Sequence, residues 1–272
     1  MTACLRTVLF ASAAALALTA PSAAQSAQAG PGAGEPMNIF ALGAAYLPDY
    51  TGSDDYRVIP FGAVRYEWGE VVIRTEGPGL AADLYRSGPL TAGVYGRWSG
   101  GRNDVDDAVV ALLPEVDNSI ILGGFANLQL AQNVFTGFDR ISIGANLGVD
   151  ALGEFDGAAW STSASYMTAL SQTSFLVLSA SVSGYSDDYA DTLFSVDAAG
   201  AAASGLPVFN AEGGVQDIGV NALINWGLGE DWSVTTILGV SQLQGDFADS
   251  PIVAVRGEET QAFTGVALGR RF

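Results

Sequence analysis

Apolar and polar residues alternate along most of the chain, in segments of about ten residues separated by Gly, Asp, Asn or Pro. The clearest segment is 140–150, where apolar side chains occupy one face and Ser, Gly, Asn and Asp occupy the other. The same pattern recurs at 158–170, 175–184 and 215–226. A period of two residues predicts β-strands that have one apolar and one polar face.

The composition of the polar face separates a membrane barrel from a soluble sandwich, which also alternates. That face consists mainly of Ser, Gly, Asn and Thr, which are small groups suited to a narrow lumen. Beyond the N-terminal segment no apolar run reaches the roughly 20 residues of a membrane-spanning helix. With 49% hydrophobic and only 15% charged residues, the chain is predicted to be all-β, a single antiparallel transmembrane β-barrel.

The number of alternating segments is about twelve, an even number as expected for a single-chain bacterial barrel. Two of the segments, 71–75 and 80–85, are short, so ten strands is the alternative. Short turns alternate with long loops, which predicts turns on the periplasmic side and loops outside. Residues 131–139 are long for a periplasmic turn. The predicted strands are 38–46, 57–67, 71–75, 80–85, 90–98, 119–130, 140–150, 158–170, 175–184, 215–226, 232–243 and 261–272.

The N-terminus has the features of an export signal. Arg6 precedes an apolar stretch from Val8 to Ala20, and small residues follow. We predict a signal peptide over 1–24, with cleavage at the latest after residue 29, a short periplasmic segment over 25–37, and the barrel over 38–272. The only cysteine, Cys4, leaves with the signal, so the mature chain is expected to lack disulfides and thiolate metal sites.

Charge and residue types exclude several functions. The chain has 11 basic residues, all Arg, against 29 acidic residues, and its net charge of −18 makes nucleic acid a poor partner. The absence of histidine removes Ser–His and Cys–His catalysis and His-ligated metals. Carboxylate pairs such as Asp54 and Asp55 lie in predicted loops without an apolar pocket to raise a pKa. We therefore expect no enzyme, no cofactor and no metal centre.

The acidic residues of the long loops form a group of their own. We interpret them as solvated loop charge, and weak Ca²⁺ or Mg²⁺ binding is the alternative, although no EF-hand spacing is present. The group comprises Asp49, Asp54, Asp55, Asp104, Asp106, Asp107, Glu115, Asp117, Asp187, Asp188, Asp191, Asp246 and Asp249.

Three arginines are predicted to point into the lumen. Alternation places Arg65, Arg74 and Arg97 opposite apolar neighbours, and Glu67 and Glu76 share faces with the first two. An arginine facing lipid at the midplane would cost about 2–4 kcal/mol, which supports the inward placement. The set is either a structural network that braces or plugs the lumen, or a charged constriction that selects solutes.

Residues near the strand ends predict contacts with the membrane interface and the export machinery. Trp68, Trp226 and Trp232 lie in or beside short turns, where they would form the lower aromatic girdle. Val266, Leu268 and Phe272 resemble the terminal signal that is read by the barrel-insertion machinery, although Arg270 interrupts their face.

Several segments resemble the MipA/OmpV family, named for MltA-interacting protein and outer-membrane protein V. They are spread over nearly the whole predicted mature chain in the family's order. The segments are YLPDYTGSDDYRVIPF at 46–61, RTEGPGLAADL at 74–84, GPLTAG at 88–93, LFSV at 193–196, ASGLP at 203–207 and GDFADSPIV at 245–253.

This resemblance implies a barrel in the outer membrane of a Gram-negative bacterium, in contact with lipid and lipopolysaccharide. One branch of the family is described as a scaffold that joins a lytic transglycosylase to a peptidoglycan synthase, and we expect a similar role here. Two alternatives remain: a narrow pore for small solutes, and a surface adhesin that acts through the long acidic loops.

Overall fold

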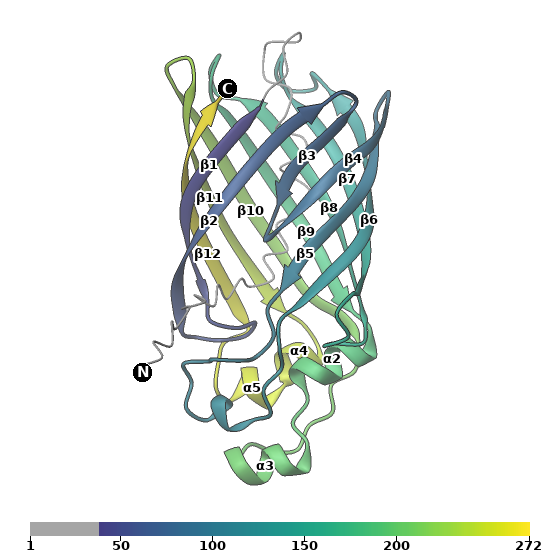
Figure 1. Cartoon of the computed structure of the whole chain (residues 1–272), viewed down its shortest axis with the longest axis vertical. Helices are drawn as coiled ribbons and strands as arrows, with labels where there is room; N and C mark the ends of the chain where they lie inside the picture. The colour runs from purple at the N-terminus through teal and green to yellow at the C-terminus, as the bar shows by residue number, and fades with distance from the viewer. Residues whose placement is uncertain (1–37) are drawn as a thin grey trace, which may run out of the picture.

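Twelve antiparallel strands close into one barrel in the computed structural model, which describes residues 38–272 (Figure 1). The predicted signal peptide and segment 25–37 lie outside the described residues. Strand β1 pairs with β12 and closes the barrel. The strands are β1 Ile39–Pro48, β2 Tyr56–Trp68, β3 Val71–Glu76, β4 Gly79–Ser87, β5 Leu90–Ser99, β6 Ser119–Gln132, β7 Arg140–Asp150, β8 Ala158–Ala169, β9 Phe175–Tyr185, β10 Gly214–Leu228, β11 Trp232–Leu243 and β12 Thr260–Arg271.

The predicted single barrel of twelve strands is confirmed. Predictions and observed strands differ only at their ends; the segment predicted at 215–226, for example, extends to Gly214–Leu228. The two short segments form β3 and β4, so the ten-strand alternative is wrong. Among the residues described, no helix is long and apolar enough to cross a membrane.

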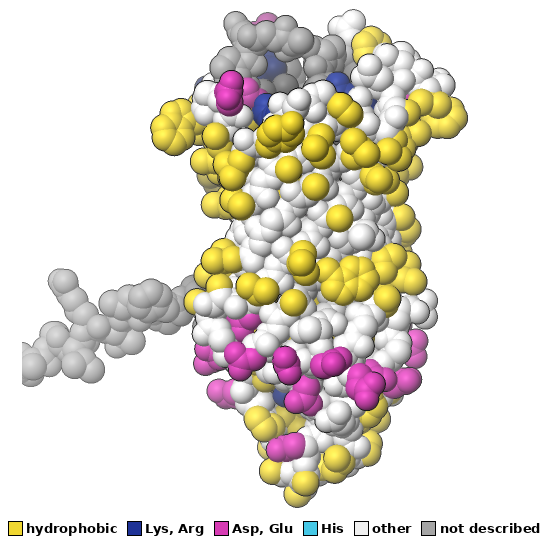
Figure 2. Space-filling model, turned by 90° about the vertical axis from the view of Figure 1, so that its right-hand side faces the viewer, with side chains coloured by type: hydrophobic (Ala, Val, Ile, Leu, Met, Phe, Trp, Pro, Cys, Tyr) yellow, Lys and Arg dark blue, Asp and Glu magenta, His cyan; other side chains and the backbone are white. Residues whose placement is uncertain are grey.

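The outer face is apolar because alternate residues of each strand point outward. On β7, Ile143, Leu147 and Val149 are exposed, whereas Gly148 between them is buried. Figure 2 shows two hydrophobic bands around the visible face, separated by a zone with fewer hydrophobic side chains. Trp68, Trp226 and Trp232 are exposed at the end of the barrel that carries the short turns.

The two ends of the barrel differ in structure. Both ends of the described chain and the short turns lie at one end, together with the 133–139 turn, and the long loops lie at the other (Figure 1). The long loops contain elements that the sequence analysis treated only as loop. These are the 3₁₀ helix η1 Val110–Leu112 and the helices α2 Asp187–Phe194, α3 Ala198–Ser204, α4 Asp246–Asp249 and α5 Pro251–Ala254.

The wall is interrupted between β2 and β5. Strand β3 has only six residues, and β2 pairs with it only from Arg65 to Trp68. The β3–β4 hairpin therefore ends partway along the barrel (Figure 1). Among the described residues, no strand pairs with residues 56–63 of β2 on the side away from β1.

Candidate functional site: an arginine-lined lumen beneath a closed mouth

Three buried arginines lie on the inner faces of strands around the interrupted part of the wall. Arg65 on β2 lies directly opposite Arg74 on β3, and Arg97 on β5 lies opposite Gly79 at the start of β4. All three are at least nine-tenths buried. Strand alternation positions them, because their neighbours Val64, Ile73 and Trp98 take the other face of the sheet.

The arginines differ in their partners. Nη2 of Arg65 donates a hydrogen bond to Glu67 at 2.5 Å. Arg74 donates hydrogen bonds to Glu76 at 2.5 Å and to Asp83 at 3.1 Å. Arg97 forms no ion pair among the described residues and lies over the Tyr95 ring, 5.9 Å from its centroid. Of the set expected in the lumen, two arginines are thus bonded to their expected glutamates, and Arg97 is not joined to them.

Asp83 is a member of this network that the sequence analysis missed. It lies on β4 with Ala81, and both are buried, so the alternation of that short strand carried the signal. Its second oxygen lies 3.9 Å from Arg86, which is 40% exposed. Asp83 therefore links the buried Arg74 to a more exposed arginine.

Several buried polar atoms in the lumen have no hydrogen-bond partner within the described protein. On the interrupted side they are Nε and Nη1 of Arg65, Nη2 of Arg74 and Nε of Arg97. Buried donors normally form a hydrogen bond, and a buried donor without one costs about 1–3 kcal/mol. These nitrogens therefore require solvent or a solute as acceptor. Four buried atoms across the lumen likewise have no hydrogen-bond partner within the described protein: Asn127 Nδ2, Asn146 Oδ1, Ser179 Oγ and Asp217 Oδ1.

The barrel end that carries the long loops, which the sequence analysis predicts to be extracellular, is closed by an apolar cluster that joins loops to the inner wall. Tyr189 of α2 stacks on Tyr185 of β9 with ring centroids 3.8 Å apart, and its hydroxyl bonds Ser99 at 2.6 Å. Phe247 of α4 contacts Phe194 edge-on at 5.0 Å. These rings are almost fully buried, so side chains fill the mouth of the barrel.

A second apolar cluster lies among the loops themselves and contains Tyr50, Val110, Leu113, Val196, Leu206 and Ile252. Burial raises the pKa of Tyr50 well above its ordinary value, so this phenol is neutral at physiological pH. Four loops at this end contribute to the two clusters. We call the structure that they form, which comprises residues 49–55, 100–118, 186–213 and 244–259, the cap.

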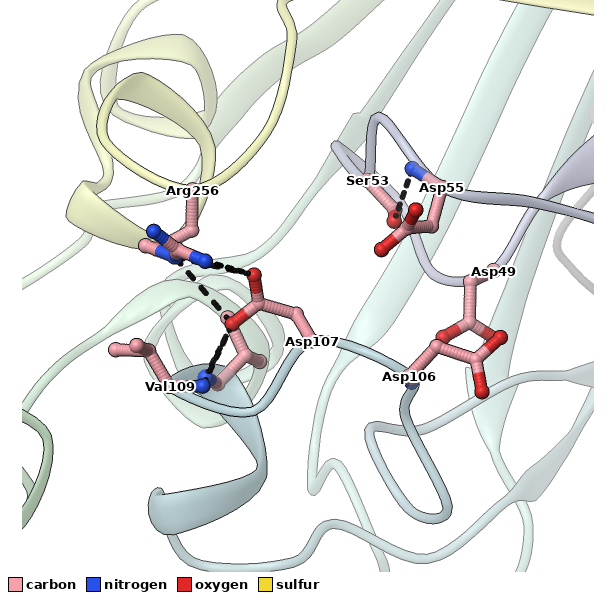
Figure 3. A network of polar contacts seen from close by, with 8 residues as sticks. Asp49, Ser53, Asp55, Asp106, Asp107, Val109 and Arg256 are labelled. Carbon is pink, nitrogen blue, oxygen red and sulfur yellow. Dashed lines mark hydrogen bonds and ion pairs between the residues drawn. The ribbon is translucent and has the colours of Figure 1, made fainter.

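Charged groups tie the loops of the cap to one another (Figure 3). Arg256 donates to Asp107 through Nη2 at 2.6 Å, and the same carboxylate accepts the amides of Val109 and Val110. Burial alone would raise the pKa of Asp107, but the guanidinium and the two amides outweigh it and lower the pKa. The Asp106 amide donates to Asp49, which also pairs with Arg57.

Arg102 provides a further tie. Its guanidinium donates to the carbonyl oxygens of Leu193 at 2.5 Å and Pro114 at 3.3 Å, so it joins α2 to the 100–118 loop. Burial lowers the pKa of Arg102 to about 10, which still leaves the group charged at neutral pH.

The loop acids fall into two groups. Asp49 and Asp107 are buried in ion pairs, so the expectation that all loop acids are solvated is wrong for these two. Others, such as Asp54 and Asp188, are exposed, and Figure 2 shows acidic side chains gathered at the extracellular end. Among residues 38–272, no group of three or more acidic, His or Cys residues is arranged to hold a metal ion.

The periplasmic end is organised locally. In the 133–139 turn, the carboxylate of Asp139 accepts the amides of Val134, Phe135 and Thr136 at 2.6–2.8 Å. Burial would raise the pKa of Asp139, but these bonds together lower it. The turn leaves Phe135 and Phe138 largely exposed.

The last strand places the predicted insertion-signal residues Val266, Leu268 and Phe272 at exposed positions. Arg270 shares that outer face, and its guanidinium lies over the ring of Trp232, 5.4 Å from the centroid. A cation over an aromatic ring at the interface is an ordinary arrangement, so Arg270 does not break the apolar band.

A closed, even-stranded antiparallel barrel with an apolar outer band, and short turns opposite long loops, defines a transmembrane β-barrel of the outer-membrane type. The family model of MltA-interacting protein MipA matches residues 40–272. The chain therefore belongs to the MipA family.

Solved structures similar to this chain are outer-membrane proteins. A structure titled CymD monoaromatic hydrocarbon channel shares 12% identity, covering 88% of this chain and 89% of its own, with a TM-score of 0.39. OmpT of Vibrio cholerae shares 6% identity over 88% and 97% of the two chains, also at 0.39. The channel DcaP of Acinetobacter baumannii shares 9% over 88% and 96%, at 0.32. No curated protein matches the chain in sequence.

Proposed function

We propose that this protein is a non-catalytic scaffold that binds cell-wall enzymes at the periplasmic end of its barrel. The family is named for interaction with MltA, and the partners we propose are a lytic transglycosylase and a peptidoglycan synthase. The observation that carries the proposal is the closed extracellular mouth. A barrel whose mouth is filled by Tyr185, Tyr189, Phe194 and Phe247 suits an anchor better than an open diffusion pore.

The contact surface that we propose is the periplasmic rim. Most turns at this end are short, so the 133–139 turn offers the largest structured surface, and Phe135 and Phe138 are 75% and 68% exposed on it. Phe135 packs edge-on against Tyr166 of β8 at 5.9 Å, which leaves Phe138 as the freer of the two aromatic groups.

Capture of a purified lytic transglycosylase by the barrel in lipid nanodiscs tests the binding directly. We expect the wild type to retain the enzyme and Phe138→Ser to weaken retention about tenfold, as for an exposed aromatic anchor. Leu152→Ser is the matched control, because Leu152 is 58% exposed in the extracellular 151–157 turn. Equal retention by both variants would remove the rim from the proposal, and no retention by the wild type would refute the scaffold.

Single-channel conductance tests the closed mouth separately. Wild-type protein and Arg97→Ala in planar bilayers should both be silent. A variant in which a flexible linker replaces residues 187–212 should show discrete openings, which proves that the assay detects an unplugged barrel. Openings in the wild type that Arg97→Ala alters would instead support the solute pore.

The surface adhesin remains a hypothesis. Its test is whether cells that carry the protein lose adhesion after the same 187–212 replacement. The exposed acids at the extracellular end, such as Asp188, are the groups that would make such contacts.

A further inference from the structure

The interruption of the wall lies at membrane depth. Tyr46 and Tyr56 stack at the extracellular ends of β1 and β2, with centroids 5.1 Å apart, and Trp68 lies at the periplasmic end of β2. Residues 57–63 of β2 therefore lie between two aromatic levels, where the outer face is apolar. On the extracellular side of the β3–β4 hairpin, the wall is open between residues 57–63 and residues 98–104. We call this stretch the seam.

The two ends of the seam are defined by hydrogen bonds. At the end of the seam nearer the periplasm, the Val64 amide donates to Oγ1 of Thr75 at 2.8 Å. At the extracellular end of the seam, Arg57 donates to the carbonyl oxygen of Asp104 at 3.2 Å. At the hairpin, β3 and β4 hold β2 and β5 three strand spacings apart, about 14 Å. From the hairpin toward the extracellular end, the seam narrows to the contact between Arg57 and Asp104.

The edge of β2 along the seam is a true strand edge. Because main-chain groups of successive residues point to opposite neighbours, those of residues 58, 60 and 62 point the same way as the Val64 amide, toward the seam. Pro60 occupies one of these positions and has no amide to pair. Proline within sheets is confined to edges, first positions and bulges.

A free strand edge inside a membrane needs a partner. Unpaired main-chain groups facing hydrocarbon cost several kcal/mol each, and irregular backbone occurs at this depth only against protein or a water-filled cavity. The carbonyl oxygens of residues 58, 60 and 62 and the amides of Val58 and Gly62 therefore need water or a polar molecule beside them.

The inner side of the seam carries one arginine whose charge is not paired. Arg65 forms an ion pair with Glu67, and Arg74 forms ion pairs with Glu76 and Asp83. Arg97 is 9% exposed, has no ion pair in the described chain, and keeps a buried Nε without an acceptor. Asp217 on β10 interacts electrostatically with Arg97 but forms no ion pair with it in the described chain.

We propose that a single-chain amphiphile with a carboxylate head enters the barrel sideways through the seam. Its carboxylate accepts hydrogen bonds from Arg97, its hydrocarbon tail passes through the seam into the lipid, and water that enters with the head hydrates the main-chain groups of the β2 edge. Arg97 is a single guanidinium without an ion pair in the described chain and so matches a singly charged head, because a guanidinium binds a carboxylate through two parallel hydrogen bonds. The site is independent of the periplasmic rim, so either proposal can fail without the other.

Photo-crosslinking with a diazirine-bearing dodecanoate tests this proposal on the full barrel in nanodiscs. Mass spectrometry should locate the adducts mainly at residues 57–63 and 98–104. Unlabelled dodecanoate should compete, whereas dodecanol, which lacks the charge, and acetate, which lacks the tail, should not. Dodecyl phosphate as a competitor distinguishes a phosphate-headed lipid from a carboxylate.

Arg97→Gln is the decisive variant, because it breaks no ion pair and should fold. It should lower labelling about tenfold, the effect of losing one charged hydrogen-bonding partner. Arg140→Gln, on the fully paired wall at the periplasmic end, should leave labelling unchanged. Both variants are first checked for the mobility shift on heating that marks a folded barrel.

Three results would overturn the proposal. The first is labelling spread evenly over lipid-facing residues such as 218–226, and the second is labelling insensitive to Arg97→Gln. The third is a disulfide-linked dimer of Gly62→Cys, which would show that a second copy covers the edge. A Cβ at Gly62 has its nearest neighbour 3.8 Å away, so that variant is compatible with the fold.

Discussion

The two ends of the barrel are stabilised in different ways. At the extracellular end, residues far apart in the chain hold one another, as in the bond between Arg256 and Asp107, 149 residues apart. At the periplasmic end, Asp139 binds amides of its own turn, three to five residues away, and also accepts from the hydroxyl of Tyr166 on the neighbouring strand β8. The cap is therefore expected to loosen as one unit, whereas each turn responds alone.

The largest expected difference between the ends comes from removing a buried ring. Phe247→Ala should destabilise the cap by about 3–5 kcal/mol, the usual cost of deleting a buried phenylalanine. Limited proteolysis should then cut several cap loops, while the barrel keeps its heat-induced mobility shift. Phe138→Ala at the other end should change neither measurement, because that ring is largely exposed. Cleavage confined to 244–259 would contradict a cap that acts as one unit.

A smaller effect is expected from the charged tie. Asp107→Asn should weaken the cap by about 1–2 kcal/mol, since Arg256 is 38% exposed and the pair is partly screened. Protease cleavage of both 100–118 and 244–259 should accelerate roughly tenfold. Asp139→Asn serves as the local counterpart and should alter only the 133–139 turn.

Acidification should weaken both the cap and the 133–139 turn. The folded-state pKa values of Asp107 and Asp139 are both lowered, so their stabilisation is complete above the unfolded value near 4 and is lost as pH falls through the folded value. Hydrogen exchange followed from pH 6 to pH 2 should show several cap loops losing protection together, against one turn at the other end. In the Asp107→Asn variant, the cap should lose less protection over this pH range. A loss equal to that of the wild type would assign the transition to other groups.

The smallest effect is expected at the membrane interface. Arg270→Ala removes the cation above Trp232 and should cost about 0.5–1 kcal/mol in urea unfolding, without changing cap proteolysis. A loss well beyond that range would mean that Arg270 has a further partner at the periplasmic rim.

The strands were predictable because alternation with a period of two is a local signal. Even the six-residue β3 was predicted to within one residue. The short helices were not predicted, although α3 has a recognisable start and stop. Asp197 accepts the amide of Gly200 at the helix start, and Gly205 ends the helix in the left-handed conformation that glycine favours.

The candidate site was predictable only in part, for the same reason. Glu67 and Glu76 lie two residues from their arginines on the same strand, so alternation alone pairs them. Asp83 comes from another strand, and its contact with Arg74 depends on the register. The bond between Asp107 and Arg256 depends on the folding of two loops, which no local pattern specifies.

Pro60 also has a consequence for how copies of this protein meet in a crowded membrane. An exposed strand edge is a template on which another chain can add a strand, and that addition leads to aggregation. A proline in the middle of the edge of β2 removes one donor from the ladder that such an intruder would need. The barrel can therefore keep part of its wall unpaired without polymerising edge to edge with its neighbours.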